Sequence, residues 1–421
     1  MGKISTEHLK PGMTLGEDLK HPNGRLLLSQ GTRLEANHLR IFKMWGVMAV
    51  EIEGESENGP PVPPEKIDPA VIQLAEKLIR NRFSRSNVEH PFLRKLLTHC
   101  SLRRTQQMIL SPNSLGMGIS AETDGEVVPL PSTPPASTGP RKQLQAFIED
   151  DIELASLPNI FFEISKVISD SRSSVIHVAD VISKDPGLSA KLLRIVNSAF
   201  YNFPSKVDTI SRAVMIVGTK QLSTLALGTS VISIFHNIPG EMVDMKSFWQ
   251  HSFACGIGAR MISSFKNVAN TERLFVAGLL HDIGRIILYK YFPSKGRDIL
   301  LRAKQARCHL FTAESAVLGF DHGQIGGMLL KKWNLPLILE NSVECHHNPL
   351  QSKFPLEASI LHLADILTNA LGIGTSGEHF VPPIQPEVWE ELALPVEFFT
   401  NIIPLIDRQV EEAMHNFFDG H

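Results

Sequence analysis

Cysteine is scarce in this 421-residue sequence, which contains four. They stand far apart and form no Cys-x-x-Cys pair: Cys100, Cys255, Cys308 and Cys345. This spacing argues against a disulfide framework and against a zinc motif with short spacings. The first residues, MGKISTEHLKPG, lack the apolar core of a secretory signal peptide. Both features predict a cytoplasmic protein.

The sequence also lacks an excess of charge of either sign. Its 41 Lys and Arg residues nearly balance 44 Asp and Glu residues, for a net charge of −3. Such a chain has no global basic field, so we expect neither nucleic acid nor an anionic membrane as a partner. The apolar runs are interrupted well before the roughly 20 residues that a spanning helix needs. With 43% hydrophobic and 20% charged residues, the composition is that of a globular protein with two or three domains.

The first 53 residues predict a small α/β domain. Strands are expected at 13–19 and 25–28, joined by a Pro-Asn-Gly turn whose Asn-Gly pair suits a tight hairpin. A helix at 35–45 and a strand at 47–52 follow. The segment contains no constellation of catalytic residues, so we expect a structural, dimerising or sensory role.

Two linkers are expected further along the chain. Residues 54–66 are acidic and proline-rich, and residues 111–141 are rich in Pro, Ser, Thr and Gly without a sustained period. Residues 67–110 between them show the apolar spacing of helices. From 142 to 421 the helical pattern is strong and no strand pattern competes with it. The expected fold class is therefore mainly α, with the small α/β domain at the N-terminus.

One helix in the C-terminal region has a clear beginning and end. Asp185 precedes Pro186, a pair typical of a helix start. The apolar residues that follow share one face and predict core packing: Leu188, Leu192, Leu193 and Val196. Asn197 and Ser198 end this helix, where we expect a cap or a hydrogen-bond clamp rather than a catalytic role.

The pair His281-Asp282 closes the apolar run LFVAGLL. A charge buried there needs a partner, and a metal ion would use both side chains at once. An ordinary His-Asp pair held by hydrogen bonds is the alternative. Gly278 and Gly284 beside the pair would let another helix or a ligand approach closely.

Further candidate ligands lie in the same part of the chain, each on a predicted helix or at its end. The candidate metal set, spread over about 115 residues, is His251, His281, Asp282, His322, His346, His347 and Asp365. Helical bundles build metal centres from side chains of several helices in this way. A remnant pocket held by hydrogen bonds is the alternative.

The adjacent histidines His346 and His347, and the residues Cys345 and His362 near candidate ligands, each allow more than one role. On a helix, His346 and His347 would diverge by roughly 100°, so either they serve two ions or one of them is not a ligand. Cys345 beside them is either a soft ligand or a small buried thiol. His362 is three residues before Asp365 and shares its helix face.

The order H…HD…D resembles the HD superfamily of metal-dependent phosphohydrolases. His322 and the pair His346-His347 are similar to the additional ligands of its HD-GYP branch, which hydrolyses cyclic di-GMP. A second pattern, VADVISKDPGLSAKLLRIVNSAFYNFP followed by SRAVMIVGTKQLSTLALG, resembles the HDOD domain, an HD-related output module of bacterial signalling proteins. This resemblance covers about 145–375 and includes GLLHDIG, LGFDHGQIGGMLLKKWNLP and ECHHNP. Residues 1–53 resemble the small domain often found ahead of HD-GYP phosphodiesterases.

The resemblance implies an all-helical domain at 142–421 and one or two divalent ions, Fe, Mn or Zn. It favours Asp365 as a ligand and leaves His362 behind it or on the surface. Two features depart from the HD-GYP pattern: no Gly-Tyr-Pro loop follows the histidine pair, and Arg285 replaces the usual Lys after HDIG. Arginine can still hold a phosphate, with different geometry. Asp282 and Arg285 are the residues expected to act in any catalysis.

Two functions fit these observations. The first is a bacterial signal-transduction protein whose HDOD domain is a regulatory output module with signalling protein partners and a bound metal. The alternative is a metal-dependent phosphohydrolase or phosphodiesterase with a nucleotide ligand such as a cyclic dinucleotide. In the alternative, the ion would activate water for attack on phosphorus. The sequence indicates no particular oligomeric state.

Overall fold

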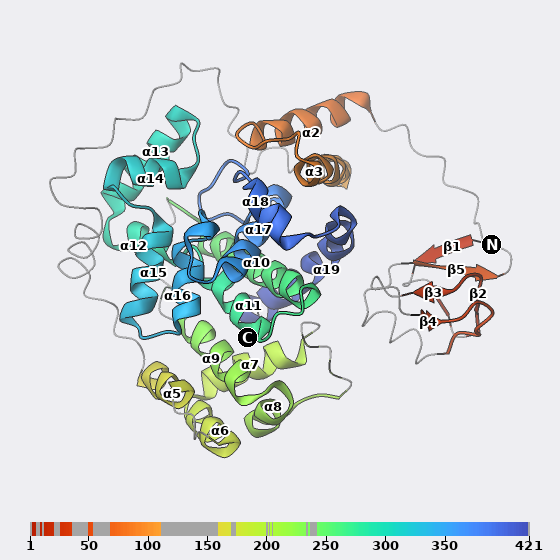
Figure 1. Cartoon of the computed structure of the whole chain (residues 1–421), viewed down its shortest axis with the longest axis horizontal. Coiled ribbons are helices and arrows are strands. Elements are labelled where there is room, and N and C mark those ends of the chain that lie inside the picture. Colours follow the sequence, from red (N-terminus) through yellow and green to blue (C-terminus); the bar gives the residue numbers. More distant parts are fainter. Residues whose placement is uncertain are drawn as a thin grey trace. The chain divides into compact units, whose positions relative to one another are not determined.

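The computed structural model describes residues 2–5, 9–10, 12–20, 26–35, 49–53, 68–110, 159–169, 174–198, 201, 203, 205–232, 235 and 242–419. The chain forms two compact units, one of residues 1–70 with 397–405 and one of residues 71–396 with 406–421. The helices and strands are shown in Figure 1. The predicted fold class, mainly α with a small N-terminal strand region, is confirmed. Within the described ranges, no helix has the length and apolar content needed to cross a membrane.

The first unit contains short antiparallel strands. They are β1 (Gly2–Ser5), β2 (Thr14–Leu15), β3 (Leu19–Lys20), β4 (Leu26–Leu28) and β5 (Ala49–Glu53). β5 lies between β1 and β2, and β3 pairs with β4. The predicted strands at 25–28 and 47–52 are confirmed as β4 and β5. The strand predicted at 13–19 is divided into β2 and β3, because the chain bends at Gly16 and Glu17.

The first unit also contains a strand that the sequence did not predict. β1 was not predicted, although it pairs with β5 over its whole length. The predicted helix at 35–45 and the predicted turn between the hairpin strands fall almost entirely outside the described residues. The buried apolar core of the unit consists of Leu9, Leu15, Leu34, Val50 and Ile52.

The second unit begins with two helices, α2 (Pro69–Arg82) and α3 (Pro91–Leu110). Each starts with proline, which is tolerated there because the first helical N–H has no partner in the helix. α3 packs against α17 (Pro355–Leu371). The ring of Phe92 stacks on that of Trp389 in α18 (Pro386–Leu392), with centroids 5.1 Å apart. The helices at 68–110 therefore pack together with helices from the C-terminal part of the chain.

Five helices drawn in yellow to green lie at one end of this unit in Figure 1. They are α5 (Asn159–Ser169), α6 (Val175–Ser183), α7 (Pro186–Asn197), α8 (Ile210–Val217) and α9 (Thr219–Ile232). The predicted helix start is confirmed, since Asp185 Oδ1 accepts a hydrogen bond from the Leu188 amide at 2.9 Å. The predicted clamp is also confirmed: the Asn197 side chain bonds both the N–H and the C=O of Val207, each at 2.7 Å.

The remaining helices include those that carry the His-Asp pair and the other candidate ligands. They are α10 (Met245–Phe265), α11 (Thr271–Leu280), α12 (Ile283–Tyr291), α13 (Pro293–Ala306), α14 (Leu310–Leu318), α15 (His322–Lys332), α16 (Leu337–Glu344), α17, α18 and α19 (Val396–Met414), with the short segments η3 (Pro349–Gln351) and η4 (His415–Asp419). α10 packs on α11 and α17, and α15 packs on α12 and α16.

Two glycines allow these helices to approach closely, as their sequence positions predicted. A Cβ at Gly278 would lie 2.5 Å from Cα of Gly256, so α11 can cross α10 only where both residues lack side chains. A Cβ at Gly284 would collide with the backbone carbonyl of His322. These two contacts hold the His-Asp pair between α10 and α15.

Candidate metal centre

His281 and Asp282 lie at the junction of two helices. His281 follows the last residue of α11, and Asp282 precedes the first residue of α12. The side chains are 0% and 1% exposed, and His281 Nε2 lies 3.1 Å from Asp282 Oδ2. The junction turns both side chains into the interior of the helical unit.

Two further predicted ligands meet the pair from neighbouring helices. His251 of α10 places Nε2 3.5 Å from Asp282 Oδ2 and 3.4 Å from Asp365 Oδ1. Asp365 belongs to α17, and its Oδ1 is also 3.4 Å from His281 Nε2. Two imidazoles and two carboxylates thus come together from three segments of the chain.

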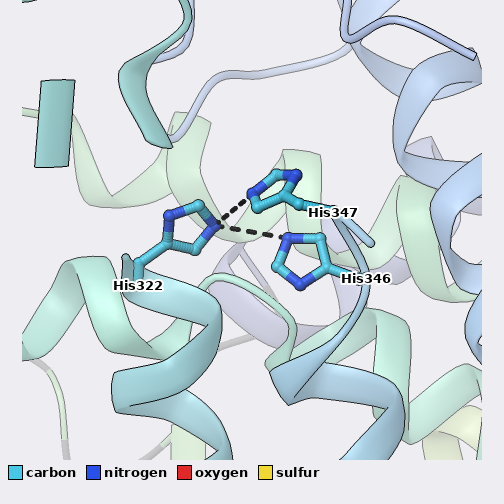
Figure 2. A group of neighbouring side chains, drawn as sticks. All are labelled: His322, His346 and His347. Atoms are coloured by element: carbon cyan, nitrogen blue, oxygen red, sulfur yellow. Dashed lines mark hydrogen bonds between the residues drawn. The ribbon is translucent and has the colours of Figure 1, made fainter. Parts of the chain in front are cut away.

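Three histidines form the other side of the cluster (Figure 2). Nε2 of His322 lies 3.3 Å from Nε2 of His346 and 3.0 Å from Nε2 of His347. His322 Nε2 is also 2.9 Å from Asp282 Oδ1. Asp282 therefore joins the two halves, with one carboxylate oxygen directed to each half.

The helical geometry assumed for His346 and His347 is wrong. α16 ends at Glu344, so both histidines lie in the turn that follows it. The turn brings their ring centroids to 3.9 Å, and both rings face His322 (Figure 2). The 100° divergence of adjacent helical residues does not apply because the backbone has left the helix.

Hydrogen bonds behind the rings orient three of the histidines. Nδ1 of His281 is 2.7 Å from the Gly278 carbonyl, and Nδ1 of His346 is 2.8 Å from the Val343 carbonyl. Nδ1 of His322 is 2.6 Å from Glu314 Oε2. Each acceptor favours a proton on Nδ1, which leaves Nε2 as the nitrogen directed into the cluster.

His362 supports the cluster from behind. It is 3% exposed, and its Nδ1 lies 2.8 Å from the backbone carbonyl of His346. Asp365, three residues later on the same helix, points into the cluster. Of the two residues, Asp365 lies beside the other candidate ligands, whereas His362 contacts the backbone behind them. Cys345 is half-buried and belongs to none of the groups of neighbouring ligand atoms found among the described residues.

The residues present fit a cation better than they fit hydrogen bonds alone. Nδ1 of His251 is buried without a hydrogen-bond partner among the described residues, and Nε2 of His251 and of His281 lie beside carboxylate oxygens without hydrogen-bond geometry. Three groups have ligand atoms within 4.8 Å of one another: His322, His346 and His347; His251, His281 and Asp282; and Cys255, His281 and Asp365. Buried nitrogens left without a bond are costly, and a metal ion would satisfy several of them together.

The electrostatics of the cluster also indicate a place for positive charge. Burial and the neighbouring His322 and His281 lower the pKa of His346 to about 3, so this ring is neutral. Burial alone would raise the pKa of Asp282, but Arg285 and His281 hold it well below its usual value. The cluster thus combines an ionised carboxylate with a neutral imidazole, a ligand pair suited to divalent transition metals.

Arg285 lies beside the cluster, within a buried polar network. Its guanidinium is 3.3 Å from Asp282, 3.2 Å from Glu314 and 2.6 Å from the Ser376 hydroxyl. The side chain is 3% exposed, and Glu378 lies 3.8 Å away. In this conformation Arg285 orients a candidate ligand, Asp282, and its donors are directed to protein groups.

The sequence reading missed several members of this site. Glu314, Ser376 and Glu378 are buried beside Arg285, and Cys255 lies one helical turn after His251. Glu314 is the one charged residue in the segment LFTAESAVL. This was the only sequence feature that could have indicated a buried role for it. Ser376 and Glu378 lie in the loop after α17, where no sequence pattern marked them.

Residues 154–349 match the HDOD domain family. A curated relative, an uncharacterized protein of Treponema pallidum (strain Nichols), is 27% identical over 210 residues, which cover 49% of this chain and 40% of the relative. The chain therefore spans less than half the length of that relative. Residues 1–53 lie outside the family match.

Two solved structures have a similar fold. An HDOD domain protein with unknown function from Geobacter sulfurreducens is 20% identical with a TM-score of 0.54, over 66% of this chain and 97% of that one. A candidate signal transduction protein from Marinobacter aquaeolei VT8 is 22% identical with a TM-score of 0.52, over 66% of this chain and 65% of that one. At these identities the likeness concerns the fold alone. The family match to HDOD at residues 154–349 and the shared fold therefore agree.

Proposed function

We propose that this HDOD domain is a metal-binding regulatory domain of a bacterial signalling protein. It holds one or two divalent ions, Fe, Mn or Zn, and acts on signalling partners. The observation that carries the proposal is the convergence of seven polar side chains in one buried cluster. They are His251, His281, Asp282, His322, His346, His347 and Asp365.

The contacts around the ligands support a built site rather than a chance cluster. Carbonyl or carboxylate acceptors hold the far nitrogens of His281, His322 and His346. Asn369 Nδ2 donates to Asp365 Oδ1 at 2.7 Å. Hydrogen bonds of this kind fix the orientation of metal ligands and strengthen their binding.

Burial favours a regulatory role over hydrolysis. Six of the seven ligands are at most 4% exposed, and His347 is half-buried. The ring of Phe311 stacks on His347 with centroids 4.3 Å apart. A nucleotide substrate needs a cleft that opens onto the reacting groups. In this conformation the ligands are packed against protein on nearly every side, as expected for ions that stabilise a fold or a conformational state.

The second candidate function is a metal-dependent phosphohydrolase or phosphodiesterase acting on a nucleotide such as a cyclic dinucleotide. The observation in its favour is the permanent cation of Arg285, 3.3 Å from the ligand Asp282. Bound ions would supply an activated water and stabilise charge that develops on phosphate. Arg285 would orient Asp282 and, once released from its protein partners, would offer its guanidinium to a phosphate oxygen.

Metal content tests the proposal. Anaerobically purified protein is compared with the double variant His281→Ala/Asp282→Ala by elemental analysis, with His379→Ala as the control because His379 is exposed and outside the cluster. We expect one or two equivalents of Fe, Mn or Zn in the wild type and the control, and a loss in the double variant. Absence of metal from folded wild type, even after incubation with each ion, would overturn the proposal.

A hydrolysis screen separates the two functions. The loaded protein is incubated with cyclic dinucleotides and simple phosphodiesters, with the double variant in parallel. Turnover that disappears with His281 and Asp282 would establish the phosphohydrolase. Metal binding without turnover, together with metal-dependent capture of a partner, is the outcome expected for the regulatory domain.

A further inference from the structure

Cys255 lies against one half of the candidate metal centre. It occupies α10 four residues after His251, so both side chains are on the same helix face. The residue is 0% exposed. Its sulfur, a ring nitrogen of His281 and a carboxylate oxygen of Asp365 all lie within 4.8 Å of one another.

Unsatisfied ring nitrogens point to a ligand on this side of the cluster. Nδ1 of His251 is buried and has no hydrogen-bond partner among the described residues, and Nε2 of His251 and of His281 lie beside carboxylate oxygens without hydrogen-bond geometry. Nδ1 of His281 is already held by the Gly278 carbonyl, so Nε2 is the nitrogen that faces Asp282 and Asp365. An ion placed between these groups would also be close to the sulfur.

We propose that the Cys255 thiolate is a direct ligand of the ion held by His251, His281 and Asp365. The inference rests on the proposed metal-binding function and specifies the chemistry of one of its two halves. That half offers nitrogen, oxygen and sulfur donors, whereas the half formed by His322, His346 and His347 offers nitrogen donors and one oxygen of Asp282.

Charge balance is consistent with a thiolate when two ions are present. Two divalent ions bring four positive charges. The carboxylates Asp282 and Asp365 contribute two negative charges and the thiolate contributes one. One divalent ion would leave the three anionic ligands, Asp282, Asp365 and the thiolate, with one uncompensated negative charge among them, which burial disfavours. Metal binding releases the thiol proton to solvent, because a coordinating thiol is deprotonated.

A sulfur donor determines which metals the site prefers. Thiolate favours borderline and soft ions such as Zn²⁺, Fe²⁺ and Co²⁺ over Mn²⁺, which prefers oxygen donors. Among the three metals expected from the sequence, Cys255 therefore selects zinc or iron over manganese for this half of the site.

Cobalt loading of the full chain tests the inference. A thiolate bound to Co²⁺ gives an intense charge-transfer band in the near ultraviolet, which nitrogen and oxygen ligands do not give. We expect the band in the wild type and in Cys345→Ser, the control for a thiol beside His346. Cys255→Ser should lose the band while retaining bound cobalt. Wild type that binds cobalt without the band, or a band that persists in Cys255→Ser, would overturn the inference.

X-ray absorption on zinc-loaded wild type gives a second measurement that requires no variant. A sulfur scatterer at about 2.3 Å from zinc is expected. A shell of nitrogen and oxygen alone would exclude Cys255 as a ligand even if Cys255→Ser fails to fold. If the domain binds no metal at all, the wild type will bind neither cobalt nor zinc. That result differs from metal binding without a sulfur ligand, which would overturn only the role of Cys255.

Discussion

Oε2 of Glu314 on α14 lies 2.6 Å from Nδ1 of His322 and 2.8 Å from the backbone N–H of the same residue. The carboxylate therefore fixes both the ring and the start of α15. Its other oxygen is 3.2 Å from Nε of Arg285. The pKa of Glu314 is lowered to about 2: burial alone would raise it, but His322 and Arg285 outweigh burial. Glu314 is thus an ionised carboxylate that orients a candidate metal ligand.

Replacing Glu314 with Gln should weaken metal binding by about 10- to 100-fold, the usual effect of losing the carboxylate behind a metal-bound histidine. The amide keeps the size of the side chain but loses the charge. Zinc affinity is measured by competition with a chelator, and Glu390→Gln, an exposed residue, is the control. An unchanged affinity in Glu314→Gln would show that His322 needs no such support.

Arg82→Met tests whether α2 influences the centre. Arg82 Nη2 donates to the backbone carbonyl of Asn369, and the Asn369 side chain bonds Asp365. Losing a charged donor to a part-buried carbonyl should cost about 1–3 kcal/mol of the free energy of unfolding. We expect this loss in urea denaturation, together with weaker metal binding. Arg80→Met, on the exposed face of the same helix, should change neither. Reduced stability with full metal affinity would mean that α2 supports the fold without affecting the ligands.

Phe311→Ala should speed the exchange of metal with solvent. The Phe311 ring stacks on His347, the half-buried candidate ligand. The ring of His309 also stacks on Phe311, with centroids 5.4 Å apart. Removing the ring opens this approach without removing a ligand. The rate of metal extraction by a chelator should rise, while equilibrium affinity changes little. Phe162→Ala, which truncates an exposed ring on α5, is the control. Equal extraction rates would place the entry route elsewhere.

Metal affinity should increase with pH. Burial and Arg285 lower the pKa of His322, but Glu314 and Asp282 raise it more, to about 9 in the metal-free protein. This pKa lies above the usual His value, so the ring holds a proton below about pH 9, and a metal must displace it. Affinity should rise by about tenfold per pH unit for each proton released, up to about pH 9. Zinc titrations between pH 6 and 9 measure this slope. A flat profile would show that the ligands are already deprotonated.

The fold class and the candidate ligands were predicted from local features of the sequence. Helical periodicity predicted the mainly α architecture, and Asp185 before Pro186 marked a helix start that the structure confirms. Gly278 and Gly284 predicted close helix contacts because a missing side chain matters wherever two backbones meet. The residue types His and Asp were informative in themselves, since few other side chains suit a transition metal.

The arrangement of the site was decided by tertiary structure. The turn after α16 directs His346 and His347 to the same point, although helical spacing would separate them. Glu314 and Cys255 enter the site only through the packing of α14 and α10 around the His-Asp junction. Sequence determined which residues favour helices and which can bind a cation, because those properties belong to single side chains and their near neighbours. Distances between residues far apart in the chain depend on how whole helices pack, and only the folded structure fixes them.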